Sequence, residues 1–127
     1  MDKSISSGLK STFLIHCIVA LVFGFVFLLF PQVWGNLAGV QIKAHEMYRM
    51  LGAAILALSL SSWLAYRAPK WESVRILVLT EILWTVLAAA IALYYLLRWS
   101  FPPLYWLVVI VMAGFAALFT FFYFKNR

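Results

Sequence analysis

Residues 13–30 read FLIHCIVALVFGFVFLLF, an unbroken run of 18 residues without lysine, arginine, aspartate or glutamate. Its length is close to the ~20 residues that an α-helix needs to cross the ~30 Å hydrocarbon core of a bilayer. Three further apolar runs follow at residues 48–66, 74–97 and 104–124. None of the four alternates apolar with polar residues, as barrel strands do, so each is predicted to be a transmembrane helix.

The composition supports this interpretation and excludes the main alternatives. Apolar residues make up 66% of the 127 residues and charged residues 11%, whereas a typical soluble domain is nearer ~45–50% apolar and ~25% charged. A chain of this length cannot hide such an excess in its core, and disordered chains need low hydrophobicity and high charge. Residues 1–127 are therefore predicted to form a single integral membrane domain.

The links between the four runs are short, and the longest covers residues 31–47. Short links make sequential helices antiparallel neighbours. The predicted fold is therefore all-α, a transmembrane four-helix bundle with up-down-up-down topology. Lys3 and Lys10 ahead of the first run resemble the start of a signal peptide, but no small-x-small cleavage site follows. We therefore expect this helix to be kept in the mature protein.

The net charge of +6 comes from basic residues that stand singly between the apolar runs. They form no basic stripe, so we expect no nucleic-acid partner. They are interpreted as topology signals, because cytoplasmic loops are enriched in Lys and Arg. Seven lie on the side of the two termini and three on the other, which predicts a multi-pass protein of the cell membrane with cytoplasmic N- and C-termini. The seven are Lys3, Lys10, Arg67, Lys70, Arg75, Lys125 and Arg127, and the three are Lys43, Arg49 and Arg98.

Glu81 is the one acidic residue inside an apolar run. It follows Val74 by seven positions, which places it about 10 Å into its helix at ~1.5 Å per residue. An acid at this depth normally faces the bundle interior or a wet cavity and is a candidate functional residue. The alternative is that it is hydrogen-bonded to a neighbouring helix and locks the packing. Other polar side chains of the same half could form a pocket with Glu81, namely His16, Ser59, Ser62, Thr80 and Thr85.

His16 lies near the cytoplasmic end of the first run, at a depth similar to that of Glu81. The two helices could therefore present both side chains to one cavity. An imidazole changes charge near neutral pH, so beside a carboxylate it suits a proton relay or a pH-sensitive lock. The alternative is a structural histidine bonded to a serine or threonine. A metal ion needs three or four ligands and no second histidine lies on this side, so no metal site is predicted.

Small residues recur at four-residue spacing in the second run, at Ala53, Ala57, Ser61 and Ala65. Small side chains at this spacing let two helix backbones approach closely, so this face is predicted to pack against a neighbouring helix. The phenylalanines of the first run are interpreted as ordinary lipid-facing and packing residues: Phe23, Phe25, Phe27 and Phe30.

On the opposite side of the membrane, Arg49 and Trp34 are candidates for contact with lipid headgroups. Arginine binds phosphate well, and tryptophan is enriched at the membrane interface. The chain contains no nucleotide-binding, serine-hydrolase, zinc-protease or dithiol motif. Its single cysteine, Cys17, excludes an intramolecular disulfide. We therefore predict no cofactor and no catalytic residues.

One pattern resembles a known family. A first apolar helix that ends at Pro31, the stretch between Gly35 and Gly39, and then YRMLGAAILALSLSSWLAYR at residues 48–67 look like small four-helix membrane proteins of bacteria and archaea near the DoxX-like group. The resemblance covers the first two predicted helices, about half of the chain. It implies a four-helix bundle in the plasma membrane. Some members of the group accompany membrane oxidoreductases, but no catalytic residue set transfers to this sequence.

These observations favour a non-enzymatic membrane protein with an accessory, scaffold or lipid-binding role. Its expected partners are membrane lipids, together with a second copy of the chain or another membrane protein. The alternative is a small oligomeric proton-coupled transporter or channel in which Glu81 binds the proton. An enzyme ranks third, because the sequence shows no pairing of a nucleophile with a base.

Overall fold

The computed structural model describes residues 4–127, and these residues form helices and no strand. Four of the helices are long and apolar enough to cross a membrane. This confirms the all-α fold class and supports the prediction of a membrane protein. Lys3, one of the predicted topology signals, lies outside the described residues. The elements are α1 (Ser7–Leu29), α2 (Pro31–Ala38), α3 (His45–Arg67), α4 (Trp71–Trp99) and α5 (Tyr105–Asn126).

The four long helices extend beyond the apolar runs that predicted them. α1 begins six residues before residue 13 because Ser6 caps it, with its side-chain oxygen accepting the Leu9 backbone N–H at 3.4 Å. α4 is the longest at 29 residues and runs from Trp71 to Trp99. An apolar run marks only the part of a helix suited to hydrocarbon, whereas backbone hydrogen bonds continue into the polar interface.

The predicted link at residues 31–47 contains a short helix, α2, that was not predicted from the sequence. Pro31 is its first residue, where a missing N–H is tolerated. Gly39 ends it in the left-handed conformation, with φ of 69°, and donates its N–H to the Gly35 carbonyl. α2 buries Trp34 and Ala38, and its exposed side mixes polar Gln32 and Asn36 with apolar Val33 and Leu37. Eight residues are too few to produce a clear apolar period, which is why the composition of this segment indicated only a connection.

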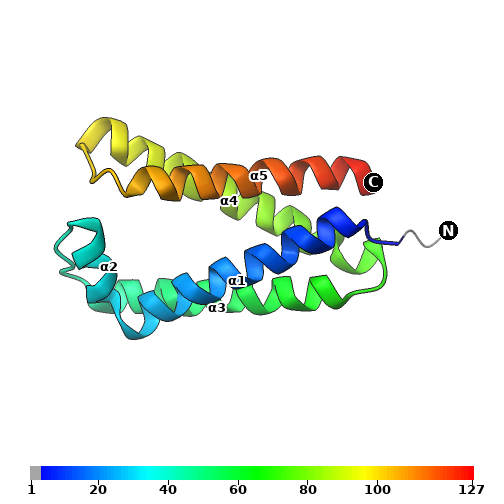
Figure 1. The fold of residues 1–127 in the computed structure, drawn as a ribbon, viewed down its shortest axis with the longest axis horizontal. Helices are drawn as coiled ribbons and strands as arrows, with labels where there is room; N and C mark the ends of the chain where they lie inside the picture. Colours follow the sequence, from blue (N-terminus) through cyan, green and yellow to red (C-terminus); the bar gives the residue numbers. More distant parts are fainter. Residues whose placement is uncertain (1–3) are drawn as a thin grey trace.

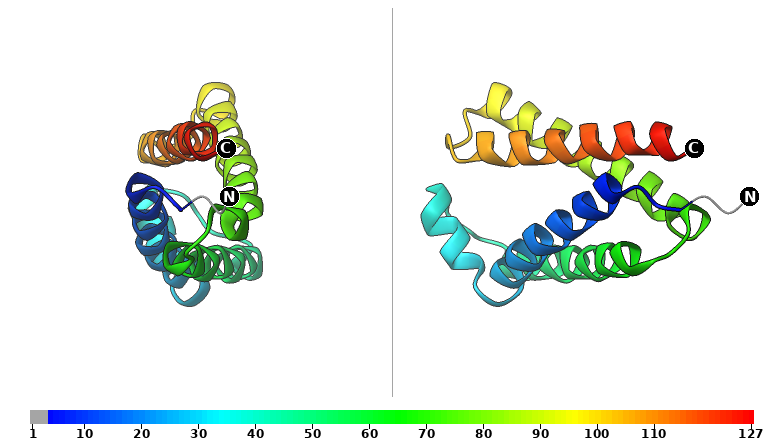
Figure 2. Two further views of the ribbon diagram at one scale, coloured as in Figure 1. Left: turned by 90° about the vertical axis from the view of Figure 1, so that its right-hand side faces the viewer. Right: turned by 45° about the vertical axis from the view of Figure 1, so that its right-hand side comes forward.

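The long helices associate as two pairs, α1 with α3 and α4 with α5 (Figure 1). We call the end of the molecule that holds both chain termini the termini end, and the opposite end the α2 end. The two pairs lie close together at the termini end and diverge toward the α2 end, where α2 lies beside the opening between them (Figures 1 and 2). The pairs therefore pack together at the termini end and enclose a cavity between them further toward the α2 end.

Two apolar clusters hold the pairs in this arrangement. The larger lies toward the termini end and joins all four long helices through Leu9, Phe13, Ala65, Val74 and Phe119, each fully buried. A second cluster at the α2 end packs α2 and the loop after it onto α1. Its buried members are Phe27, Trp34, Ala38 and Ile42.

α1 and α3 approach each other closely at Gly24 and Gly52. A Cβ atom on Gly52 would lie 2.5 Å from the Leu28 backbone nitrogen and 2.8 Å from the Gly24 carbonyl oxygen. Such a contact leaves no room for any side chain, so the two backbones touch directly. The packing face of α3 was therefore predicted wrongly in part, since Ala53 and Ala57 are exposed. The helix is rotated so that Gly52, Ser59, Ser62 and Ala65 are its buried residues.

Candidate functional site

Three helices each contribute one polar side chain to a buried cluster between the pairs. His16 of α1 lies with its Nδ1 atom 2.8 Å from the Ser62 Oγ of α3. Ser62 Oγ donates to Glu81 Oε1 of α4 at 3.2 Å. His16 Nε2 lies 3.3 Å from Glu81 Oε2, which closes the ring of contacts. We call these three residues the polar ring.

The polar ring is sealed from solvent. The exposed fractions of His16, Ser62 and Glu81 are 2%, 0% and 1%. Two phenylalanines of α5 cover the imidazole edge-on, with ring centroids 4.9 Å (Phe115) and 5.7 Å (Phe119) from that of His16. Burial of this degree makes each hydrogen bond in the ring hard to replace by water.

The donors of the polar ring follow from the hydroxyl group of Ser62. With its one hydrogen donated to Glu81, Ser62 accepts a hydrogen from Nδ1 of His16. The remaining contact joins Nε2 of His16 to Oε2 of Glu81. Among the described residues, Oε2 is buried and has no hydrogen-bond partner besides this contact. One hydrogen placed between these two atoms would satisfy both of them.

The other predicted pocket residues lie around the polar ring without joining it. Thr85 is buried one turn further along α4 and donates to the backbone carbonyl of Glu81 at 2.6 Å. Ser59 is buried one turn before Ser62, but it donates to the Cys17 carbonyl at 2.8 Å and so ties α3 to α1. Thr80 is exposed and donates to the Ile76 carbonyl of its own helix. The structure therefore places Thr80 outside the cluster.

The two candidate headgroup contacts occupy different environments. Arg49 is exposed in the first turns of α3. Trp34 is 6% exposed, and its indole packs edge-on against Phe23, Phe27 and Tyr105 at centroid distances of 5.4–5.8 Å. Trp34 thus joins α2 to α1 and α5 and faces the interior, so it does not sit beside Arg49 as an exposed interfacial side chain.

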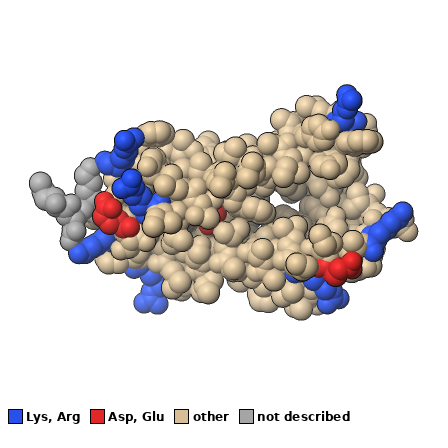
Figure 3. Space-filling view, turned by 180° about the vertical axis from the view of Figure 1, so that it is seen from behind, with Lys and Arg blue, Asp and Glu red and all other residues tan. Residues whose placement is uncertain are grey.

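A large cavity extends from the polar ring toward the α2 end. Its volume is about 810 Å³, and His16 lines it together with side chains from every helix. Apart from His16 and the aromatic polar groups, its walls are apolar side chains and aromatic rings. Figure 3 shows a hole between the two pairs near the α2 end, so the cavity opens through the side of the molecule. Wall residues include Phe23, Phe27, Trp34, Tyr48, Ile55, Trp84, Ala88, Tyr95, Tyr105 and Met112.

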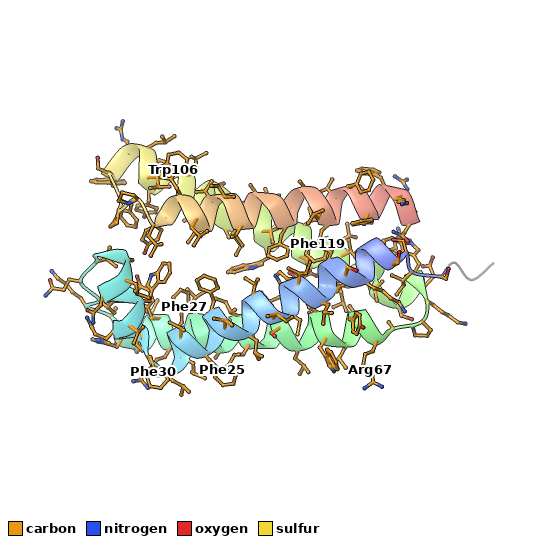
Figure 4. All side chains as sticks on the ribbon, in the orientation of Figure 1. Phe25, Phe27, Phe30, Arg67, Trp106 and Phe119 are labelled. Carbon is orange, nitrogen blue, oxygen red and sulfur yellow. The ribbon has the colours of Figure 1, made fainter. Side chains whose placement is uncertain are left out.

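Both ends of this cavity are closed by contacts between the pairs. Toward the termini end the polar ring and Phe119 join α1 to α4 and α5, and Figure 4 shows Phe119 where α1 meets α5. At the α2 end, where Figure 4 shows Phe27, the Tyr105 ring packs edge-on against the Trp34 ring, with their centroids 5.8 Å apart.

The cavity was not predicted from the sequence, because all phenylalanines of the first run were assigned to lipid-facing or packing positions. Phe25 and Phe30 are indeed exposed, but Phe23 and Phe27 line the cavity. A signal was present in the spacing, since residues 16, 20, 23 and 27 follow the alternating four- and three-residue steps of one helix face. All four of those residues line the cavity.

Comparisons with protein-family models, curated proteins and solved structures find no match for this chain. The resemblance to the DoxX-like group therefore stays a prediction. The described residues also contain no group of three or more His, Cys, Asp or Glu side chains that could hold a metal ion.

Proposed function

We propose that this protein is a non-enzymatic lipid-binding protein of the cell membrane, with cytoplasmic termini and an accessory role toward other membrane components. The observation that carries this proposal is the apolar cavity of about 810 Å³ between the two helix pairs. Binding sites for small molecules typically measure ~300–1,000 Å³ and are lined mostly by apolar and aromatic side chains.

A lipid chain is the occupant that fits the position of this cavity. The walls belong to helices that are long and apolar enough to span the bilayer, and the opening faces sideways between the pairs (Figure 3). At that depth the surrounding medium consists of hydrocarbon chains. A chain entering from the side would cover apolar surface on both pairs without removing any polar group from water. A charged substrate would instead face walls that offer it no free partner.

The headgroup of such a lipid belongs at the α2 end. Tyr48 lines the cavity, and the neighbouring Arg49 is exposed at the start of α3. Lys43 in the preceding loop is also exposed. A guanidinium group can hold a phosphate through two hydrogen bonds. Arg49 directly follows the cavity-lining Tyr48, so it is placed to bind the phosphate of a phospholipid whose chain fills the cavity.

A cavity-filling substitution tests this proposal. Ala88 of α4 lines the cavity, whereas Ala90 of the same helix is exposed and does not line it. We expect Ala88→Phe to abolish retention of lipid by the purified protein, measured by native mass spectrometry in mild detergent. Ala90→Phe, which adds the same side chain outside the cavity, should retain lipid as the unmodified protein does. Equal retention by both variants, or no lipid on the unmodified protein, contradicts the proposal.

Proton-coupled transport is a second candidate function, and the close contact of His16 with Glu81 favours it. An acid paired with a histidine inside a membrane is a common element of proton pathways. This function predicts pH-driven uptake of a substrate or of protons into proteoliposomes, which Glu81→Gln would abolish. Lipid binding without transport predicts no uptake for either protein.

A further inference from the structure

The polar ring connects the two helix pairs at the inner end of the lipid cavity. His16 and Ser62 belong to the α1–α3 pair, and Glu81 belongs to the α4–α5 pair. Both the Ser62–Glu81 hydrogen bond and the His16–Glu81 contact therefore cross from one pair to the other. His16 is at the same time a wall of the cavity. A change in the hydrogen bonds of the polar ring therefore alters the contact between the pairs at the place from which they diverge.

The three contacts of the polar ring require three hydrogens. Ser62 supplies one to Glu81, and Nδ1 of His16 supplies one to Ser62. The third lies between Nε2 and Oε2, either as neutral Glu81 donating to neutral His16 or as ionised Glu81 accepting from charged His16. Both forms have zero net charge and satisfy every contact.

Adding or removing one proton breaks this match. A fourth hydrogen would give Nε2 and Oε2 one each, so two donors would face each other across 3.3 Å and the ring would carry a positive charge. With only two hydrogens, a bare imidazole nitrogen would face an ionised oxygen, and the ring would carry a buried negative charge. Either charge in an apolar site is unfavourable unless it is paired or reaches water.

No other titratable side chain described on the packed helices supplies that missing partner. α5 faces the ring with Phe115 and Phe119, and the α3 member of the ring is the hydroxyl of Ser62. On α1, the Cys17 thiol contacts Ser59 at 3.5 Å instead. On α4, Thr85 bonds to backbone carbonyls of its own helix. Within the described residues, a charged ring can gain water chiefly through the cavity beside His16.

We infer that the polar ring is a protonation-controlled clasp, which strengthens the apolar contact between the two helix pairs when it contains three hydrogens and weakens that contact when it gains or loses a proton. Release would let the pairs separate further at the α2 end, where the Trp34–Tyr105 contact joins them, and would widen the cavity that they share. This inference rests on the proposed function, because the cavity that would widen is the proposed lipid-binding site.

The Glu81→Gln variant distinguishes opening of the clasp by loss of a proton from opening by gain of a proton. A glutamine amide accepts from Ser62 with its oxygen and donates to Nε2 of His16 with its nitrogen, so it preserves all three contacts. It cannot lose a proton as the carboxyl group does. The variant should therefore keep the clasp closed in alkaline solution, while His16 can still take up a proton in acid. A purely structural ring would respond to pH in the same way with either residue.

The test measures the distance between the pairs by pulsed electron spin resonance in nanodiscs. Spin labels are placed at Met50→Cys on α3 and Leu97→Cys on α4, two exposed positions at the α2 end, in a Cys17→Ala background. The pH is varied from about 4 to about 10, which spans the ordinary titration of Glu and His side chains. We expect a shift to longer distances at both extremes for the parent protein, and only at the acid extreme for the E81Q variant.

Several outcomes would overturn the inference. These are a distance that does not change with pH, identical pH profiles for the parent and E81Q, or an E81Q protein that fails to fold although its amide should satisfy the ring. Thr80→Val is the matched control, because Thr80 is exposed on α4 beside Glu81 and takes no part in the ring. It should keep the full pH response. The distances are read without reference to lipid, so a failed lipid experiment and a failed clasp experiment are distinguishable.

Discussion

Ser62 shows how much one hydroxyl group contributes at the centre of this molecule. It is fully buried, accepts from His16 and donates to Glu81. Removing it with Ser62→Ala would leave a buried donor and a buried acceptor unpaired. The cost of an unsatisfied buried polar group is about 1–3 kcal/mol. We therefore expect a clear decrease in Tm for Ser62→Ala, measured by intrinsic tryptophan fluorescence in detergent.

Ser61→Ala is the control for that measurement. Ser61 is the neighbouring serine of α3, is only half-buried and donates to the Leu58 carbonyl of its own helix. This hydrogen bond crosses to no other helix, so its removal should change Tm little. An equal decrease for Ser61→Ala and Ser62→Ala would mean that the polar ring contributes no more than a hydrogen bond within one helix.

The depth of the polar residues could be predicted from the sequence, but their partners could not. Counting residues along two apolar runs placed His16 and Glu81 at similar depth, and they are in contact at 3.3 Å. Which of Ser59, Ser61 and Ser62 contacts His16 and Glu81 depends on how α3 is rotated about its own axis. In a membrane helix apolar side chains cover the lipid-facing surface as well as the packed one, so hydrophobic periodicity does not fix rotation.

At the scale of the helices, the contact of α1 with α3 sets the geometry of one wall of the cavity. Gly52 lies against backbone atoms of α1, which cannot move aside as a side chain can. Gly52→Ala should force the helices apart and cost about 1–3 kcal/mol, as overpacking commonly does. We expect a lower Tm and a weaker retention of lipid than in the parent protein.

Gly114→Ala provides a matched control on α5. A Cβ atom there would meet nothing within 4 Å, and alanine is favoured over glycine in a helix by up to ~1 kcal/mol. Its Tm should be unchanged or slightly higher. If both glycine substitutions had the same effect, the close approach of α1 and α3 at Gly52 would not be what stabilises the pair.

The helices themselves could be predicted more completely than the way they pack. Each long helix contains an apolar run, and only α2 escaped notice, because it is eight residues long and lies in a mixed segment. The small-residue pattern at Ala53 and Ala57 pointed to the wrong face of α3. Small residues occur on more than one face of this helix, and the face that contains Gly52 is the one that lies against the α1 backbone at Gly24 and Leu28.

At the scale of the whole molecule, the divergence of the two pairs could not be predicted from the sequence. Short links do make neighbouring helices pair, but they leave the angle between the pairs undetermined. That angle follows from the position of the contacts between the pairs. Apolar packing at Phe13 and Phe119 and the polar ring hold one end together. Toward the other end, the Tyr105 ring reaches across the cavity to contact Trp34.

The orientation of the molecule in the membrane is a separate prediction that single cysteines can test. The excess of Lys and Arg at the termini end predicts that this end is cytoplasmic. In a Cys17→Ala background, Gln41→Cys in the exposed loop after α2 should react with an impermeant maleimide in intact cells. Pro69→Cys, in the exposed link between α3 and α4, should react only after the membrane is opened. The reverse pattern would place the proposed lipid cavity in the cytoplasmic leaflet, and Arg49 would then face cytoplasmic headgroups.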